Sequence, residues 1–167
     1  MKRIFRCIAA FLFLLYILFL PGRAESANAS VYHNLRNYTV DDGLSSNHVY
    51  GIVQDSIGFI WFGTDNGLCR FDGCEFRSYT HTDGDRSSIS SNNIRRLMLD
   101  SRGQIWLALD NGVDIYTPAT DRFRHFDVRT SDGACVTGQT TEVIEDREGK
   151  IWIATVNSGL FRWNPVT

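Results

Sequence analysis

The chain has 167 residues, 43% of them hydrophobic, with 17 basic and 19 acidic side chains. Four of the basic residues and none of the acidic ones precede residue 25, which leaves 13 basic against 19 acidic residues and a formal net charge of −6 for the remainder. A net acidic chain with scattered arginines argues against a nucleic-acid-binding surface. The remaining length is enough for one core of ordinary size.

Residues 1–24 have the pattern of a secretory signal peptide. Lys2 and Arg3 give a positive start, and residues 8–20 form an unbroken apolar run before a Pro-Gly break and small residues suited to cleavage. This run is shorter than the roughly 20 residues that span a bilayer. We therefore predict an exported protein with a cleaved signal, followed by a linker over residues 25–34.

Three stretches of the sequence repeat one another. They read DSIGFIWFGTDNGLCRFDG (55–73), DSRGQIWLALDNGVDIYTP (100–118) and DREGKIWIATVNSGLFRWN (146–164). An aspartate, a glycine, a tryptophan and a second glycine recur at matching positions, and we predict that they hold the repeat together. These structural repeat residues are Asp55, Gly58, Trp61, Gly67, Asp100, Gly103, Trp106, Gly112, Asp146, Gly149, Trp152 and Gly159.

Each repeat predicts four short antiparallel strands. A mostly apolar run precedes the aspartate, a β-rich run carries the tryptophan, and two more runs follow a glycine turn. The tryptophan-bearing run is apolar on both faces, which indicates a sheet packed between two others. Four-stranded units of this length are typical of β-propeller blades. We predict an all-β, partial β-propeller of about three blades, over residues 49–93, 94–139 and 140–167, the last incomplete.

Residues 35–48 match the end of a blade. Leu35 and Tyr38 have the spacing of Phe76 and Tyr79, so this segment is predicted to be a lone outer strand with an inter-blade loop. Three blades are fewer than the four to eight, roughly, that close a propeller. The chain is therefore expected to be a piece of a larger protein, whose partners are the remaining blades or further copies of itself.

The repeat residues at the turns are predicted to have structural roles and not catalytic ones. Because the aspartates recur at equivalent turn positions, they are predicted to accept backbone N–H bonds and not to act as acids or bases. The tryptophans are predicted to join neighbouring blades, and Trp61→Ala to be among the most damaging changes. No catalytic residue, metal ligand set or cofactor is predicted.

Two cysteines flank a predicted turn. A two-residue turn at Asp72–Gly73 would set Phe71 opposite Cys74 and leave Cys69 diagonal to Cys74, which suits a disulfide poorly. We therefore favour the interpretation that these cysteines are small buried hydrophobic side chains.

Propeller geometry places the candidate binding residues on one face. The loops between the second and third strands and the loops between blades share that face, and they are rich in side chains that hydrogen-bond sugar hydroxyls. A solvated loop has the same composition. The candidate ligand-binding residues are Asp65, Asn66, Asp110, Asn111 and Asn157.

The segments DGLSSN (42–47), QDSIGFIWFGT (54–64) and GLCRFDG (67–73) resemble the two-component-regulator propeller repeat. The resemblance covers residues 35–167 and weakens in the later copies. It implies the N-terminal periplasmic sensor part of a hybrid two-component histidine kinase, in which a membrane helix, a kinase and a DNA-binding domain follow the propellers. Sensors of this family recognise oligosaccharides, so an oligosaccharide ligand is implied.

The expected function is ligand recognition in signal transduction, without enzyme activity in this chain. The kinase, and any membrane contact, are expected in segments beyond residue 167. The alternatives are a truncated fragment without a function of its own and an exported propeller enzyme such as a lyase or glycoside hydrolase. The enzyme would need convergent carboxylates or a metal cage on one face.

Overall fold

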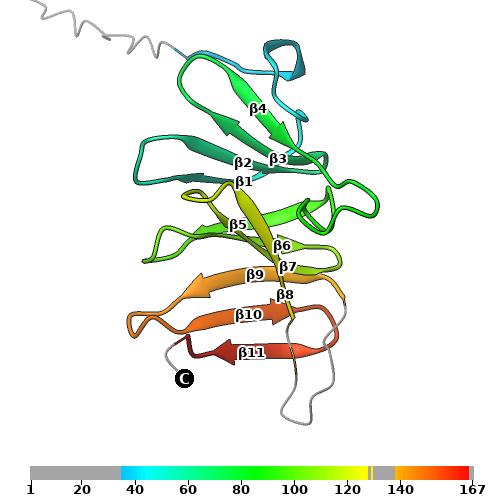
Figure 1. Cartoon of the computed structure of the whole chain (residues 1–167), viewed down its shortest axis with the longest axis vertical. Helices are drawn as coiled ribbons and strands as arrows, with labels where there is room; N and C mark the ends of the chain where they lie inside the picture. The colour runs from blue at the N-terminus through cyan, green and yellow to red at the C-terminus, as the bar shows by residue number, and fades with distance from the viewer. Residues whose placement is uncertain (1–34, 128, 130–137, 166–167) are drawn as a thin grey trace, which may run out of the picture. The chain divides into compact units, whose positions relative to one another are not determined.

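Eleven strands in three antiparallel sheets make up the described part of the chain (Figure 1). The structure is a computed structural model that describes residues 35–127, 129 and 138–165. The predicted signal peptide and linker lie outside these residues. The described residues from Asn37 onward form one compact unit. Within the described residues, no helix is long and apolar enough to cross a membrane.

Each sheet is a simple meander in which consecutive strands pair. The first contains β1 (Val49–Gln54), β2 (Ile60–Thr64), β3 (Gly67–Phe71) and β4 (Phe76–Tyr79); the second contains β5 (Ile94–Leu99), β6 (Ile105–Leu109), β7 (Gly112–Thr117) and β8 (Arg122–Phe126); the third contains β9 (Thr140–Glu145), β10 (Ile151–Thr155) and β11 (Gly159–Trp163). The predicted all-β architecture, with four, four and three strands, is confirmed.

The sheets pack face to face through two apolar layers. One layer joins the first and second sheets through Trp61, Leu68, Leu107 and Tyr116, and the other joins the second and third through residues such as Trp106. The ring centroids of Trp61 and Tyr116 lie 4.8 Å apart, and those of Trp106 and Trp163 lie 5.7 Å apart. Trp61 and Trp106 therefore join their sheets to the next one, whereas no sheet among the described residues follows Trp152.

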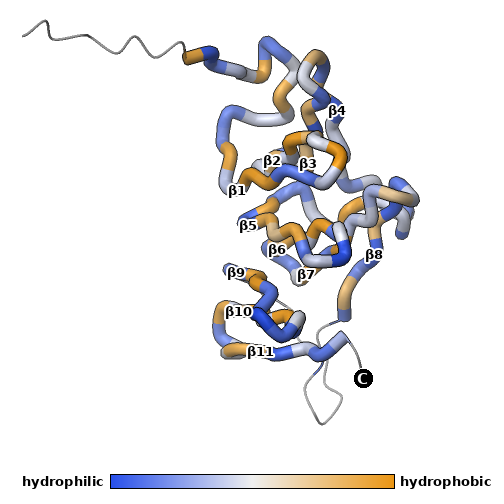
Figure 2. Tube along the Cα trace, turned by 90° about the vertical axis from the view of Figure 1, so that its left-hand side faces the viewer, coloured by the Kyte–Doolittle hydropathy of each residue, from blue (hydrophilic) through white to orange (hydrophobic). Residues whose placement is uncertain are grey.

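The first strands of neighbouring sheets approach most closely. Backbone contacts between sheets are concentrated on β1, β5 and β9 and on the strand beside them. Figure 2 shows these three strands along one side of the unit, with β4 and β8 on the other. Sheets that converge at their first strands and diverge outward have the arrangement of propeller blades. We call the side formed by β1, β5 and β9 the inner edge.

The segment before β1 differs from the prediction of a lone outer strand. Residues 35–48 contain no strand; Thr39 caps a short 3₁₀-helix, η1 (Val40–Asp42), with both hydrogen bonds of a capping box. A strand needs a neighbour to satisfy its backbone groups, and among the described residues none pairs with this segment. Tyr38 nevertheless packs on the rings of Phe71 and Phe76, at 5.2 and 5.6 Å.

The position of Tyr38 repeats a contact made between the first two blades. Tyr79, the last residue of β4, lies 5.5 Å from the ring of Tyr116 and 5.7 Å from that of Phe123 in the next blade. Phe71 and Phe76 occupy the corresponding places in the first blade. Tyr38 therefore lies where the fourth-strand aromatic of a preceding blade would lie.

The turn between β3 and β4 is also longer than predicted. Phe71 pairs with Phe76, so the turn contains four residues instead of two. Oδ1 of Asp72 accepts the backbone N–H groups of Cys74 and Glu75, each at 2.8 Å, and this fixes the wider turn. Cys69 is buried and Cys74 is exposed, and both are free thiols.

Candidate ligand-binding face and inner-edge site

The repeat aspartates serve the turns between first and second strands. Oδ1 of Asp55 accepts the backbone N–H groups of Ile57, Gly58 and Phe59, and Oδ2 accepts the indole N–H of Trp61 at 2.8 Å. Gly58 in this turn has a φ of 104°, a conformation that favours glycine over other residues. One carboxylate thus closes the turn and fixes the tryptophan.

The same bonds recur in the other two blades. The indole N–H of Trp106 donates to Asp100 at 2.9 Å, and that of Trp152 donates to Asp146 at 2.8 Å. The Trp152 N–H, followed by the backbone N–H of Lys150, holds the pKa of Asp146 below its ordinary value. Each carboxylate is occupied within its own turn. The three do not form an acid–base pair.

The second glycines of the repeat lie at the hairpins on the other end of the sheets. Gly67, Gly112 and Gly159 all have positive φ angles, of 96°, 143° and 79°. A Cβ atom on Gly67 would lie 2.4 Å from the carbonyl oxygen of Tyr79. These hairpins carry the candidate ligand-binding residues, so all five candidates lie at the same end of their sheets.

Two of the candidates hold loops in place. The side-chain amide of Asn66 donates to the carbonyl oxygen of Ser45 at 3.0 Å, and that of Asn111 donates to the carbonyl oxygen of Ser90 at 2.9 Å. Each bond ties a hairpin to the loop that enters the same blade. These amide N–H groups are used within the fold, which weakens the interpretation of both residues as ligand contacts.

The other three candidates are not brought together. Asp65 lies 2.8 Å from Nδ1 of His48, and hydrogen bonds from Ser46 and then His48 lower the pKa of its carboxyl. Asp110 and Asn157 are exposed on separate hairpins, and Asn157 has a φ of 71°. The hairpins therefore supply polar groups to one face but no single constellation.

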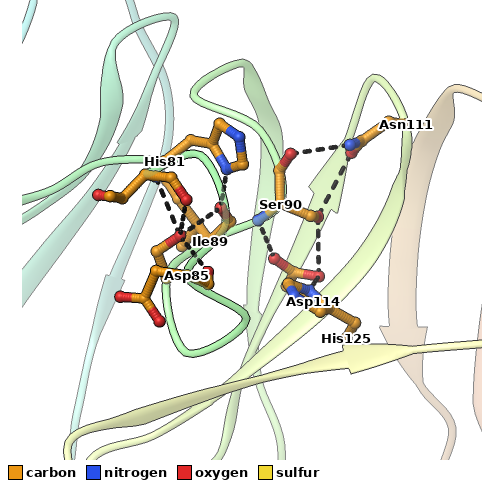
Figure 3. A network of polar contacts seen from close by, with 9 residues as sticks. His81, Asp85, Ile89, Ser90, Asn111, Asp114 and His125 are labelled. Carbon is orange, nitrogen blue, oxygen red and sulfur yellow. Dashed lines mark hydrogen bonds and ion pairs between the residues drawn. The ribbon is translucent and has the colours of Figure 1, made fainter.

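The loop between the first two blades is held by a polar network that the sequence did not reveal (Figure 3). Asp114 on β7 has only 1% of its surface exposed. It accepts the backbone N–H and the hydroxyl of Ser90 at 2.7 and 2.9 Å, and it lies 2.8 Å from Nδ1 of His125. The repeat itself carried a sign of this network. Asp114 is an acidic residue at a position of the third strand where the other two blades have Cys69 and Phe161.

The grouping of Ser90, Asp114 and His125 is not a catalytic triad. Nucleophilic catalysis needs the serine hydroxyl bonded to the histidine, which takes its proton. Here the carboxylate lies between the two, and the serine donates to it. In the same loop Nδ1 of His81 lies 2.7 Å from the carbonyl oxygen of Ile89, a contact that raises the pKa of His81. Within the described residues, no group of three His, Cys, Asp or Glu side chains could hold a metal ion.

A pocket opens on the inner edge at the hairpin end of the sheets. It is lined by Tyr50, Arg95, Arg96, Gln139 and Thr141, which come from the start of β1, β5 and β9. Tyr50, Arg95 and Thr141 occupy equivalent positions in the three blades, one residue after the Val49, Ile94 and Thr140 pairs. The inner-edge pocket is therefore the place where side chains from all three blades meet.

Two stretches of the chain match a known family of sequence repeats. The family described as Two component regulator propeller matches residues 43–66 and 88–111, each of which spans an inter-blade loop, two strands and a hairpin. The chain carries two-component regulator propeller repeats. This match agrees with the resemblance seen in DGLSSN and the following repeat.

Solved structures extend the match beyond the two repeats. One is the extracellular domain assigned to a hybrid two-component system of B. thetaiotaomicron, with a TM-score of 0.71 and 27% identity over 78% of this chain. Another extracellular domain from the same organism, also assigned to a hybrid two-component system, has a TM-score of 0.60 and 33% identity over 70% of this chain. The propeller chain is thus related to extracellular sensor domains of hybrid two-component systems.

The chain spans a small part of these relatives. It covers 19% and 16% of the two solved chains. A curated relative, Histidine kinase P4 of Formosa agariphila, is 44% identical over 54 residues, which are 32% of this chain and 4% of the relative. The part of the sensors that this chain matches is the propeller.

Proposed function

We propose that the chain is a ligand-recognising piece of the periplasmic sensor of a hybrid two-component histidine kinase, and that its ligand is an oligosaccharide. The observation that carries the proposal is the combined match of repeat and blade structure to extracellular sensor domains. Kinase activity is proposed only for the whole sensor, because the matched part is the propeller.

The face at the hairpin end supports recognition of a polar ligand. It presents Asp65, Asp110 and Asn157 at the same end of the sheets as the inner-edge pocket, which itself contains a tyrosine and arginines. Sugar-binding sites need hydrogen-bonding groups together with an aromatic surface. The repeat aspartates, in contrast, are engaged in their own turns, and this speaks against a hydrolase that uses them.

Binding of the full chain to an array of neutral and acidic oligosaccharides tests the proposal. We expect binding to one chemical class without any change in the bound sugar. A blank array would contradict the proposal and favour the alternative of a fragment without its own function. Release of shortened sugar products, measured by mass spectrometry, would instead favour the propeller-enzyme alternative.

A further inference from the structure

The two arginines of the inner-edge pocket differ in their surroundings. Arg96 is engaged through two of its nitrogen atoms: its Nε lies 3.4 Å from Glu142, and its Nη1 donates to the carbonyl oxygens of Tyr50 and Arg95 at 3.3 and 3.0 Å. Glu142 supplies its counter-charge. Arg96 therefore acts as a bridge between the first strands of the three blades.

Arg95 has no such counter-charge. Over residues 35–127, 129 and 138–165 its side chain makes no hydrogen bond or ion pair, and its Nε atom is buried without a partner. Its guanidinium carbon lies 5.9 Å from the centre of the Tyr50 ring. A buried N–H group that has lost water and gained no acceptor is unfavourable, and here the cost falls on the Nε atom alone, because the Arg95 side chain as a whole is half-buried. The arrangement favours an acceptor supplied from outside the described residues.

The neighbours of Arg95 are neutral and suited to hydroxyl groups. Tyr50 and Gln139 line the same pocket, and neither side chain has a hydrogen-bond partner among the residues that the structure describes. The hydroxyl of Thr141 donates to the carbonyl oxygen of Ala154 at 3.3 Å. Two arginines, an aromatic ring and a carboxamide thus line the pocket at the starts of β1, β5 and β9, and Arg95 is the arginine that lacks a carboxylate partner among the described residues.

We propose that the inner-edge pocket binds the carboxylate of an acidic sugar, with Arg95 as the group that recognises the charge. The guanidinium fork matches a carboxylate in a bidentate manner, and stacking on an aromatic face orients it. Tyr50 and Gln139 then contact the sugar hydroxyls. This inference rests on the proposed function, since it names the class of oligosaccharide.

The net charge of the chain means that binding of an acidic sugar must depend on a local cation. The part after residue 24 carries a net charge of −6, which repels an anion at long range. An acidic sugar therefore binds only through local contacts with a matching cation. A loss of that one cation removes the preference for the acid.

The test compares trigalacturonate with its fully methyl-esterified form on the full chain, by isothermal titration calorimetry. The two sugars differ only in charge and in the methyl groups. We expect the acid to bind about tenfold more tightly than the ester, the size of one charge-assisted contact. Equal binding of the two sugars, or binding of neither, overturns the inference without any substitution.

The substitution Arg95→Gln tests the assigned residue. We expect it to weaken the acid about tenfold and to leave the ester unchanged, while Arg95→Lys gives an intermediate loss because it keeps the charge without the fork. The matched control is Arg122→Gln, an exposed arginine on the outer strand β8. Unchanged acid binding by Arg95→Gln, or the same loss in Arg122→Gln, overturns the assignment.

The outcomes separate the two proposals. If the oligosaccharide array contains a binder but trigalacturonate and its ester behave alike, the acidic-sugar inference fails and the proposed function stands. If the whole array is blank, the proposed function fails. Thermal melting of each variant shows whether a loss of binding reflects unfolding.

Discussion

The bond between an aspartate and a tryptophan is the smallest unit from which each blade is built. The carboxylate accepts two or three backbone N–H groups of the turn and the indole N–H of the strand that follows. A buried carboxylate needs such donors, and a buried indole N–H needs an acceptor. The pair therefore satisfies both groups and aims the indole at the next blade.

The three tryptophans differ only in what they face. Trp106 is fully buried against Trp163 and Phe126, whereas Trp152 is half-buried, with Arg162 over its ring. We expect Trp106→Ala to lower the free energy of unfolding by about 3–5 kcal/mol and Trp152→Ala by clearly less. Both variants deprive an aspartate of its indole N–H, and because Asp100 is buried whereas Asp146 is half-buried, the difference combines inter-blade packing with the burial of the carboxylate.

Urea unfolding, followed at low protein concentration, measures both values. A Trp152→Ala variant that loses as much stability as Trp106→Ala would contradict the view that packing against a neighbouring blade dominates. The sequence alone predicted the packing role but assigned it equally to all three residues.

At the scale of strands, the first two blades approach through a pair of glycines. Gly51 and Gly63 face each other across β1 and β2. A Cβ atom on Gly63 would lie 2.8 Å from Cγ2 of Ile94 and 3.1 Å from Cγ of Leu97. The absence of side chains here lets β5 pack directly on the backbone of the first sheet.

The substitution Gly63→Ala should therefore destabilise the unit by about 1–3 kcal/mol, through overpacking between blades. The matched control is Ala154→Val, because Ala154 occupies the corresponding place in β10, where the described residues provide no following blade. We expect the control to change the urea midpoint little. An unchanged midpoint for Gly63→Ala would show that β5 moves freely to make room.

At the scale of the molecule, no sheet among the described residues covers the outward faces of the first and third blades. Ile144 and Leu160 on the third blade are 52% and 62% exposed, and Ile52 on the first blade is 63% exposed. Tyr38 already lies on the first blade where a fourth-strand aromatic belongs. We propose that the third blade of one copy docks on the first blade of another.

The substitution Leu160→Arg tests this proposal. A charge on the uncovered face should abolish head-to-tail association, since burying an unpaired charge is unfavourable. We expect the full chain to gain mass with concentration in sedimentation velocity, and Leu160→Arg to remain a monomer. Ser158→Arg, on the exposed hairpin next to it, adds the same charge and should associate normally. A full chain that stays monomeric at all concentrations would contradict self-association.

Much of the fold could be read from the sequence because local rules decide it. The repeat of aspartate, glycine and tryptophan, with turns between apolar runs, gave the strand order and the blade unit. The wider turn at Asp72 and the lack of a strand before Val49 were missed. The turn length and the missing strand both depend on hydrogen-bond partners, and the order of residues in the repeat does not specify these partners.

The candidate site was less accessible to sequence reasoning. Asn66 and Asn111 were chosen for their polarity, but the structure uses their amides to hold Ser45 and Ser90. Arg95 was not singled out, because the charge is one of two adjacent arginines in an ordinary strand. Only the meeting of three first strands places it beside Tyr50 and Gln139.

The sequence by itself determined that the chain builds similar four-stranded units and how each unit turns, since those features depend on residues within about 45 positions of one another. The tertiary structure decided which groups remain unsatisfied. Whether Arg95 gains a counter-charge, Trp152 a covering ring or Tyr38 a paired strand depends on neighbours from other blades. Contacts between distant segments set burial and charge pairing, and these set what a surface can bind.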